Sequence, residues 1–92
     1  MPSDKILAQV IELAAHQAGA GRAVANPGVD TLLAGGGFWL DSLALLELIV
    51  ACEQSFGVSF DEAELAPDQL NTVGSLAALV ESRLMLKRSS ES

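Results

Sequence analysis

Cysteine, histidine and basic side chains are scarce in this sequence, and these shortages exclude several classes of protein. The single cysteine, Cys52, cannot form an internal disulfide, and it shares no zinc-binding spacing with the single histidine, His16. No apolar run reaches the roughly 18 residues that span a membrane. Residues 1–5 are not followed by a signal-like apolar block. We therefore expect a cytoplasmic protein without a metal site.

The charge of the chain is strongly one-sided. Five Lys and Arg stand against 12 Asp and Glu, which gives a net charge of −7 and an isoelectric point near 4.3. No Lys or Arg lies between Arg22 and Arg83, a stretch with nine acidic residues. This charge would repel nucleic acid and anionic membranes, so neither is an expected partner. It favours a basic protein partner, although the same charge also keeps a small domain soluble.

Leucine and alanine are abundant, at 15 and 14 of the 92 residues, whereas residues typical of strands are few. A chain of this length forms one domain. We therefore expect an all-α fold: a small four-helix bundle with three main helices, one short helix and a long loop between the first two helices. The single domain is expected to comprise residues 1–92, with a core at 3–86 and a flexible polar tail at 87–92.

Three segments carry apolar residues at helical spacing and predict the main helices: 3–18, 41–56 and 73–86. Their expected N-caps are Ser3, either Asp41 or Ser42, and Thr72. The expected ends of the first two helices are Gly19 and Gly57. The inward-facing stripes are Ile6, Val10, Leu13 and Ala14, then Leu45, Leu48, Ile49, Cys52 and Phe56, then Val73, Leu76, Ala77, Val80 and Leu84.

The two connections are less regular. The loop 19–40 is long for a compact domain, so we expect apolar side chains to hold it against the bundle. These side chains are Val29, Leu32, Leu33, Phe38 and Leu40, with a short helical turn around 30–33 as an option. Within 61–71, Asp61 followed by Glu64 is typical of a helix start, and Pro67 suits the first position of a short helix that ends at Leu70.

Ser42 is the most informative polar residue. It lies where a Gly-rich loop meets a helix start, so its hydroxyl would be exposed at the positive end of the helix. A phosphate ester there would meet free backbone N–H groups, although Ser42 could equally be only an N-cap. Catalysis is not expected, because Ser42 has no Gly-x-Ser-x-Gly context and Gly35–Gly37 is not followed by the Lys of a phosphate loop.

The run from Leu40 to Val58 carries Asp-Ser-Leu, then an aliphatic-Glu-Leu-aliphatic stretch, then Glu and Phe before a turn. Together with Asp61-Glu62 and Thr72-Val73 downstream, this run closely resembles the acyl carrier proteins. The resemblance covers about residues 3–86, and its specific part is 40–73. It implies a four-helix bundle whose third helix is short, and a protein that is not an enzyme.

The resemblance implies that Ser42, flanked by Asp41 and Leu43, carries a covalent 4′-phosphopantetheine arm. A separate phosphopantetheinyl transferase attaches the arm from coenzyme A, and acyl groups are held as thioesters on its thiol. Further partners would be ketosynthase, acyltransferase or acyl ligase enzymes with basic docking patches, served in brief encounters by a monomeric carrier. The implied docking residues are Trp39, Leu46, Glu47, Val50, Glu53 and Glu62.

Roles other than docking remain open for three of these residues. Trp39 could instead flank the arm or anchor the loop, and the loop 19–40 could cover Leu46 and Val50. The sequence also departs from carriers of primary fatty acid synthesis, since Ala44 and Leu45 follow the motif where a polar residue is usual. This departure indicates a polyketide or related specialised pathway. Alternatives are a carrier of aminoacyl groups, which Asp41 argues against, and an unmodified helical interaction module.

Overall fold

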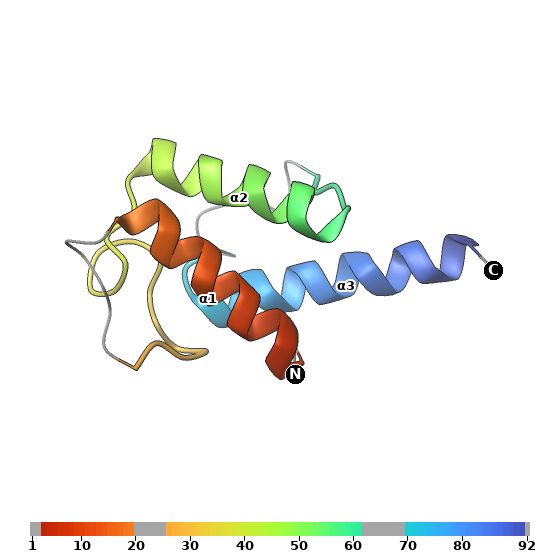
Figure 1. The fold of residues 1–92 in the computed structure, drawn as a ribbon, viewed down its shortest axis with the longest axis horizontal. Coiled ribbons are helices and arrows are strands. Elements are labelled where there is room, and N and C mark those ends of the chain that lie inside the picture. Colours follow the sequence, from red (N-terminus) through yellow and green to blue (C-terminus); the bar gives the residue numbers. More distant parts are fainter. Residues whose placement is uncertain (1–2, 20–25, 62–69, 92) are drawn as a thin grey trace.

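The computed structural model describes residues 3–19, 26–61 and 70–91, and for residues 88–91 only the backbone. Three helices form the fold: α1 (Asp4–Ala18), α2 (Ser42–Phe56) and α3 (Val73–Glu91) (Figure 1). In these described ranges the only β-type pairing is an isolated bridge between Leu32 and Thr72. The all-α prediction is therefore confirmed. The predicted short helix within 61–71 falls almost wholly on residues 62–69, which lie outside the described part.

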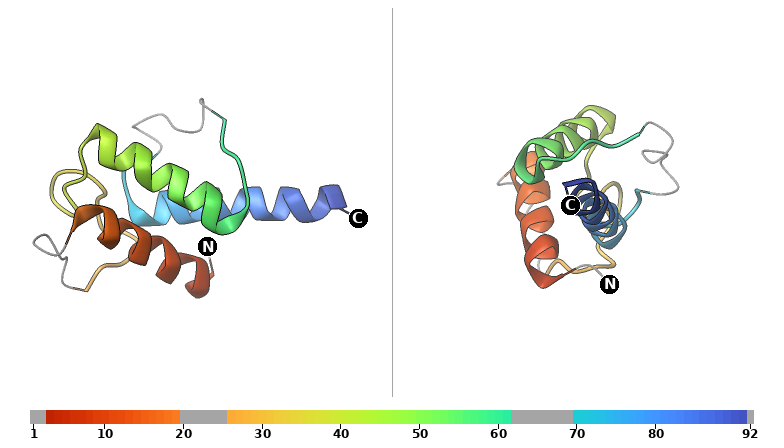
Figure 2. Two further views of the ribbon diagram at one scale, coloured as in Figure 1. Left: turned by 45° about the horizontal axis from the view of Figure 1, so that its top comes forward. Right: turned by 90° about the vertical axis from the view of Figure 1, so that its right-hand side faces the viewer.

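The helices are arranged so that α1 braces the other two. α1 packs against both α2 and α3, whereas α2 and α3 meet over a smaller area. α1 runs opposite to α2 and α3, and α3 projects beyond both of them towards the C-terminus (Figures 1 and 2). The start of α1 is tied to α3, because the backbone N–H of Ser3 donates to Glu81 Oε2 at 2.9 Å.

The helix boundaries follow local chemistry. Oxygen side chains cap all three starts: Ser3 Oγ accepts from Ile6 N, Asp41 Oδ1 from Ala44 N, and Thr72 Oγ1 from Ser75 N. These caps confirm the predicted starts and settle the second one in favour of Asp41. α1 ends at Gly19 and α2 at Gly57, whose φ of 67° is the left-handed conformation that glycine adopts without strain.

The end of α3 is not where the sequence predicted it. The helix continues to Glu91, past the expected end near residue 86. No glycine or proline occurs after Gly74, so the sequence contains no residue that would stop the helix before its final turn. The polar residues 87–91 therefore continue the helix.

The core confirms the predicted stripes. Its buried side chains include Val10 and Ala14 of α1, Leu48, Ile49 and Cys52 of α2, and Val73, Leu76, Ala77 and Val80 of α3. Half-buried side chains at the stripe edges pack against them: Ile6, Leu13, Leu45, Phe56 and Leu84. Burial, with a smaller contribution from the charge of Glu53, raises the pKa of the Cys52 thiol to about 12. Cys52 is thus a small apolar core residue, as predicted.

The described part of the first loop is held partly by side chains and partly by backbone. Leu33, Phe38 and Leu40 are buried, as predicted, but Val29 and Leu32 are each 38% exposed. The prediction was wrong for these two residues, because backbone hydrogen bonds to residues 71–74 hold this part of the loop in place. Gly74 N donates to Val29 O, Val73 N to Thr31 O, and Leu33 N to Asn71 O. Residues 28–31 form a hydrogen-bonded turn and not a helix.

Candidate functional site

Ser42 is the first residue of α2, and its side chain is exposed. The residue before it acts as the cap, since Asp41 Oδ1 accepts from Ala44 N at 2.7 Å and the carbonyl of Asp41 accepts from Leu45 N at 2.8 Å. Within the described residues, the Ser42 hydroxyl makes no hydrogen bond. The hydroxyl is therefore accessible and is not the N-cap that the sequence left open.

The start of α2 suits an attached phosphate. The N–H groups of the first turn have no carbonyl partner within the helix, and the helix end carries about half a positive charge. Asp41 takes the N–H of Ala44, which leaves those of Ser42 and Leu43 at the helix end. A phosphate ester on Ser42 would find donors and a favourable dipole there, opposed in part by the Asp41 carboxylate.

A tightly bonded loop fixes the place where α2 begins. Phe38 N donates to Leu32 O at 2.9 Å, and Leu40 N donates to Leu33 O at 2.9 Å. The backbone passes so close to itself that a Cβ on Gly37 would overlap the carbonyl of Leu32. Since Phe38 and Leu40 are also buried, the chain enters α2 from a defined position. This arrangement holds Ser42 in place without using its side chain.

Trp39 lies on the outside of this loop. Its side chain is 59% exposed, and its φ of 58° is left-handed, which is uncommon for a bulky residue. The six-membered ring covers Gly35, where a Cβ would come within 3.3 Å of it. The buried anchors of the loop are the neighbours Phe38 and Leu40, and the indole adds its contact with Gly35.

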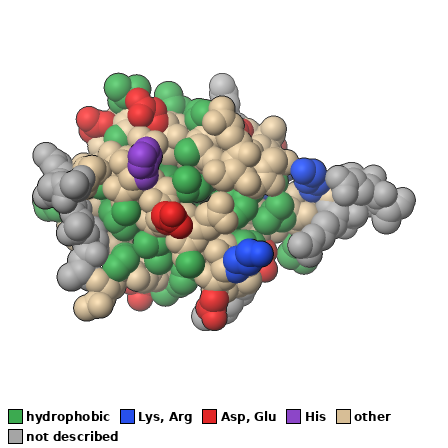
Figure 3. All heavy atoms as spheres, viewed as in Figure 1, with side chains coloured by type: hydrophobic (Ala, Val, Ile, Leu, Met, Phe, Trp, Pro, Cys, Tyr) green, Lys and Arg blue, Asp and Glu red, His purple; other side chains and the backbone are tan. Residues whose placement is uncertain are grey.

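The remaining residues implied for docking lie along α2. We define the outer face of α2 as Leu43, Leu46, Glu47 and Val50, all of which are exposed. The loop therefore does not bury Leu46 and Val50, at 54% and 42% exposure, which was the alternative considered. Hydrophobic side chains reach the surface over α2, and acidic side chains gather near its start (Figure 3).

Glu53, another acidic residue implied for docking, is placed differently from Glu47. Glu53 is half-buried, and its Oε2 accepts from Phe60 N at 3.0 Å, so this carboxylate holds the chain that leaves α2. Sequence reasoning missed this bond, because it joins residues seven positions apart across a turn. Glu62 lies outside the described residues.

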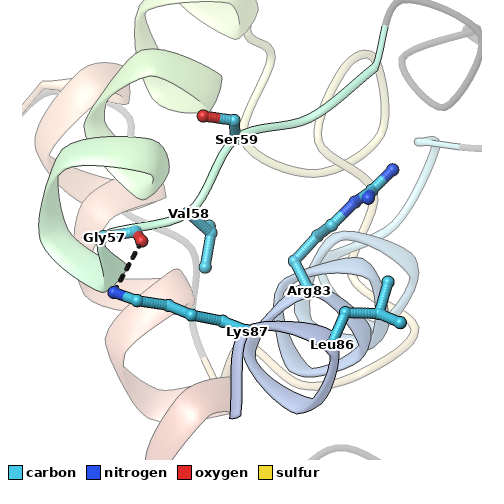
Figure 4. Close-up of a pocket in the computed structure, with 6 residues that line it drawn as sticks. All are labelled: Gly57, Val58, Ser59, Arg83, Leu86 and Lys87. Atoms are coloured by element: carbon cyan, nitrogen blue, oxygen red, sulfur yellow. Dashed lines mark hydrogen bonds between the residues drawn. The ribbon is translucent and has the colours of Figure 1, made fainter. Parts of the chain in front are cut away.

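A hollow of about 350 Å³ lies at the other end of α2, lined by Gly57, Val58, Ser59, Arg83, Leu86 and Lys87 (Figure 4). Lys87 Nζ donates to Gly57 O at 3.0 Å, and Arg83 pairs with Asp61 at 3.0 Å. These bonds tie the end of α2 and the following segment to α3. The 15 residues of α2 separate the hollow from Ser42 by about 21 Å.

Comparison with known families decides between the classes that this geometry allows. The model of the phosphopantetheine attachment site matches residues 6–80, which include all of α2 and the Ser42 region. The chain belongs to the phosphopantetheine attachment site family. No curated protein matches the chain.

Members of the phosphopantetheine attachment site family are carrier domains and not enzymes, and they hold 4′-phosphopantetheine covalently. Membership implies a phosphopantetheinyl transferase and biosynthetic enzymes as partners. Across residues 3–19, 26–61 and 70–91, no cluster of side chains could hold a metal ion. None of the helices described there has the length and hydropathy needed to cross a membrane.

Proposed function

We propose that this chain is an acyl carrier protein in which Ser42 bears the phosphopantetheine arm. The observation that carries the proposal is the exposed hydroxyl at the first residue of α2, beside the cap Asp41 and inside the span that matches the family. Its Asp-Ser-Leu context is the one expected for such a carrier. The arm supplies a thiol that holds acyl groups as thioesters.

The residues around Ser42 position the arm and contribute no catalysis. Asp41 fixes the helix start, so the Ser42 hydroxyl is left accessible to a modifying enzyme. The buried side chains of Phe38 and Leu40 fix the loop from which α2 begins. An arm attached to Ser42 would therefore leave the protein from a defined place, and any chemistry at its far end would depend on other enzymes.

The outer face of α2, together with Trp39, is the proposed docking surface for these enzymes. Leu43, Leu46 and Val50 offer apolar contact, and Glu47 offers a charge that steers a basic partner. The proposed partners are ketosynthase, acyltransferase or acyl ligase enzymes. Their contacts must be small and short-lived, because one monomeric carrier serves several of them.

A polyketide or related specialised pathway is the proposed setting, in the cytoplasm. It rests on Ala44 and Leu45, which follow the motif where carriers of primary fatty acid synthesis usually have a polar residue. Asp41 favours an acyl carrier over the peptidyl form, in which glycine is usual close before the serine.

Intact-mass measurement tests the attachment site. We expect the apo protein, incubated with coenzyme A and a phosphopantetheinyl transferase of broad carrier range, to gain one arm. Ser42→Ala should gain none. Ser55→Ala is the matched control, because Ser55 is an exposed serine in the last turn of α2, and this variant should be modified like the wild type.

Two outcomes would contradict the proposal. A wild-type protein that gains no mass is not a carrier under these conditions, and a mass gain that persists in Ser42→Ala places the arm elsewhere. Circular dichroism of Ser42→Ala checks that the helices are retained. Since Ser42 is exposed and is not the cap, we expect its replacement to leave the fold unchanged.

A further inference from the structure

Trp39 adopts a backbone conformation that suits glycine and not tryptophan. Its φ is 58°, where the Cβ of any larger residue crowds the following carbonyl. Glycine would take this conformation without that steric cost. The fold therefore has no backbone reason to place tryptophan here.

Burial does not compensate for this cost. The indole is 59% exposed, whereas Phe38 and Leu40 on either side are buried. Trp39 N donates to Ala34 O at 2.9 Å, which fixes the backbone that turns the side chain outward. The ring also has little freedom, because it lies on Gly35. The loop thus presents a large, pre-oriented aromatic side chain to the solvent, which lowers the entropy lost when a partner covers it.

The position of Trp39 relative to Ser42 narrows the choice of partner. They are three positions apart in the sequence, so their Cα atoms are at most about 11 Å apart. An enzyme that forms a bond at Ser42 Oγ must cover this neighbourhood, whereas an enzyme that acts at the far end of a flexible arm can dock on the outer face of α2 with or without Trp39. The carboxylates of Asp41 and Glu47, one just before Ser42 and one five residues after it, are both exposed, and the face of an indole also attracts cations.

We propose that Trp39 is the specificity-determining docking contact for the phosphopantetheinyl transferase that loads Ser42. The indole enters an apolar recess of that enzyme edged by Arg or Lys side chains. This inference rests on the proposed function. In the reaction, Ser42 Oγ forms a bond to the phosphorus of coenzyme A that carries the pantetheine, the bond from that phosphorus to the adenosine bisphosphate breaks, and the hydroxyl proton is released.

The test replaces Trp39 with the residue that its backbone favours. We expect Trp39→Gly to lower kcat/KM for loading from coenzyme A about tenfold, mainly through a higher KM, as for loss of an aromatic interface anchor. The melting temperature of the same variant should rise, because the steric cost is removed. The matched control is Met85→Ala on α3, since Met85 is 61% exposed and lies away from Ser42. Its loading rate should equal that of the wild type.

A second measurement distinguishes whether the enzyme or the phosphopantetheine arm covers the indole of Trp39. Trp39 is the only tryptophan, so its fluorescence reports on this position alone. We expect the same emission maximum before and after loading. A blue shift on loading would mean that the arm itself covers the indole, and this would overturn the proposal.

The possible failures can be told apart. If the wild type is not loaded, the proposed function fails. If the wild type is loaded and Trp39→Gly is loaded equally fast, only the role of Trp39 fails. A variant that is loaded slowly but melts at a lower temperature would show that the indole serves the loop, which would also overturn this inference.

Discussion

Asp41 and Ser42 are adjacent residues with separate tasks. The Asp41 carboxylate accepts from Ala44 N at 2.7 Å, a short bond in keeping with a charged acceptor at a helix start. Because Asp41 supplies the cap, the Ser42 hydroxyl has no structural role in α2. The residue that we propose to be modified is thereby separated from the residue that keeps the helix in place.

Replacement of Asp41 tests this separation. We expect Asp41→Ala to lower the free energy of unfolding by about 1 kcal/mol, since a cap is lost. For a domain of this size, that corresponds to a fall in melting temperature of about 4–8 °C. Asp41→Asn should retain most of the stability, because Asn is also a good cap. Glu12→Ala, an exposed change on α1, is the control and should melt like the wild type. Equal melting of Asp41→Ala and the wild type would contradict the role of the cap.

The helices differ in how far their neighbours support them. α1 packs against both other helices, while the end of α3 extends beyond the bundle (Figure 2). Lys87 makes the last described side-chain bond of α3, to the carbonyl of Gly57. Helical turns that extend beyond a bundle gain little from tertiary packing and are marginal in water.

Hydrogen exchange measures this difference between elements. We expect the amides of residues 88–91 to exchange fastest among the helical residues described, and the amides around Val10 and Ala14 in α1 to be among the slowest. Exchange followed by NMR, residue by residue, checks this order. Slow exchange at residues 88–91 would contradict it and would indicate that something else covers the end of α3.

For the helices and loops, the sequence predicted the features that depend on neighbouring residues. Helix periods and caps depend on neighbouring residues, so α1, α2 and the start of α3 were found with their caps at Ser3 and Thr72. The exposure of Val29 and Leu32 was not predicted, because it depends on backbone bonds to residues about 40 positions away. The end of α3 was missed because polar composition was taken as a sign of a flexible tail.

The same limit applies to the site. The position of Ser42 at a loop–helix junction was predictable, because a Gly-rich stretch and a cap surround it. The left-handed conformation of Trp39 was not, since it contradicts the preference of the residue. It arises from the bonds that close the loop around it, among them the bond from Leu40 N to Leu33 O. Similarly, the bond between Glu53 and Phe60 could not be found from helical spacing.

On the scale of the whole molecule, charge is unevenly distributed. Asp41 and Glu47 are exposed at the start and in the first half of α2, and Arg83 and Lys87 of α3 lie near the other end of α2. A basic enzyme therefore meets an attractive field around Ser42. Such a field raises association rates, and salt weakens it because ions screen exposed charges.

Reversal of one charge tests this steering. We expect Glu47→Lys to slow loading of Ser42 by the transferase at low ionic strength by roughly threefold or more, and the difference should shrink as salt is added. Glu12→Lys is the matched control, because it changes the net charge equally from a helix away from the outer face. Equal slowing by both variants would mean that total charge matters and the position does not. No slowing by Glu47→Lys would contradict steering altogether.

The burial of Cys52 has a consequence for the chemistry that the arm would carry. A second reactive sulfur in the same chain could form an intramolecular disulfide with the arm or take over its acyl group by exchange between thioesters. The native fold suppresses both side reactions, because Cys52 is sealed in the core and its thiol stays protonated at neutral pH. Cys52 therefore does not compete with the arm for an acyl group, and a thiol-specific reagent applied to the folded protein would count only arms whose thiol carries no acyl group.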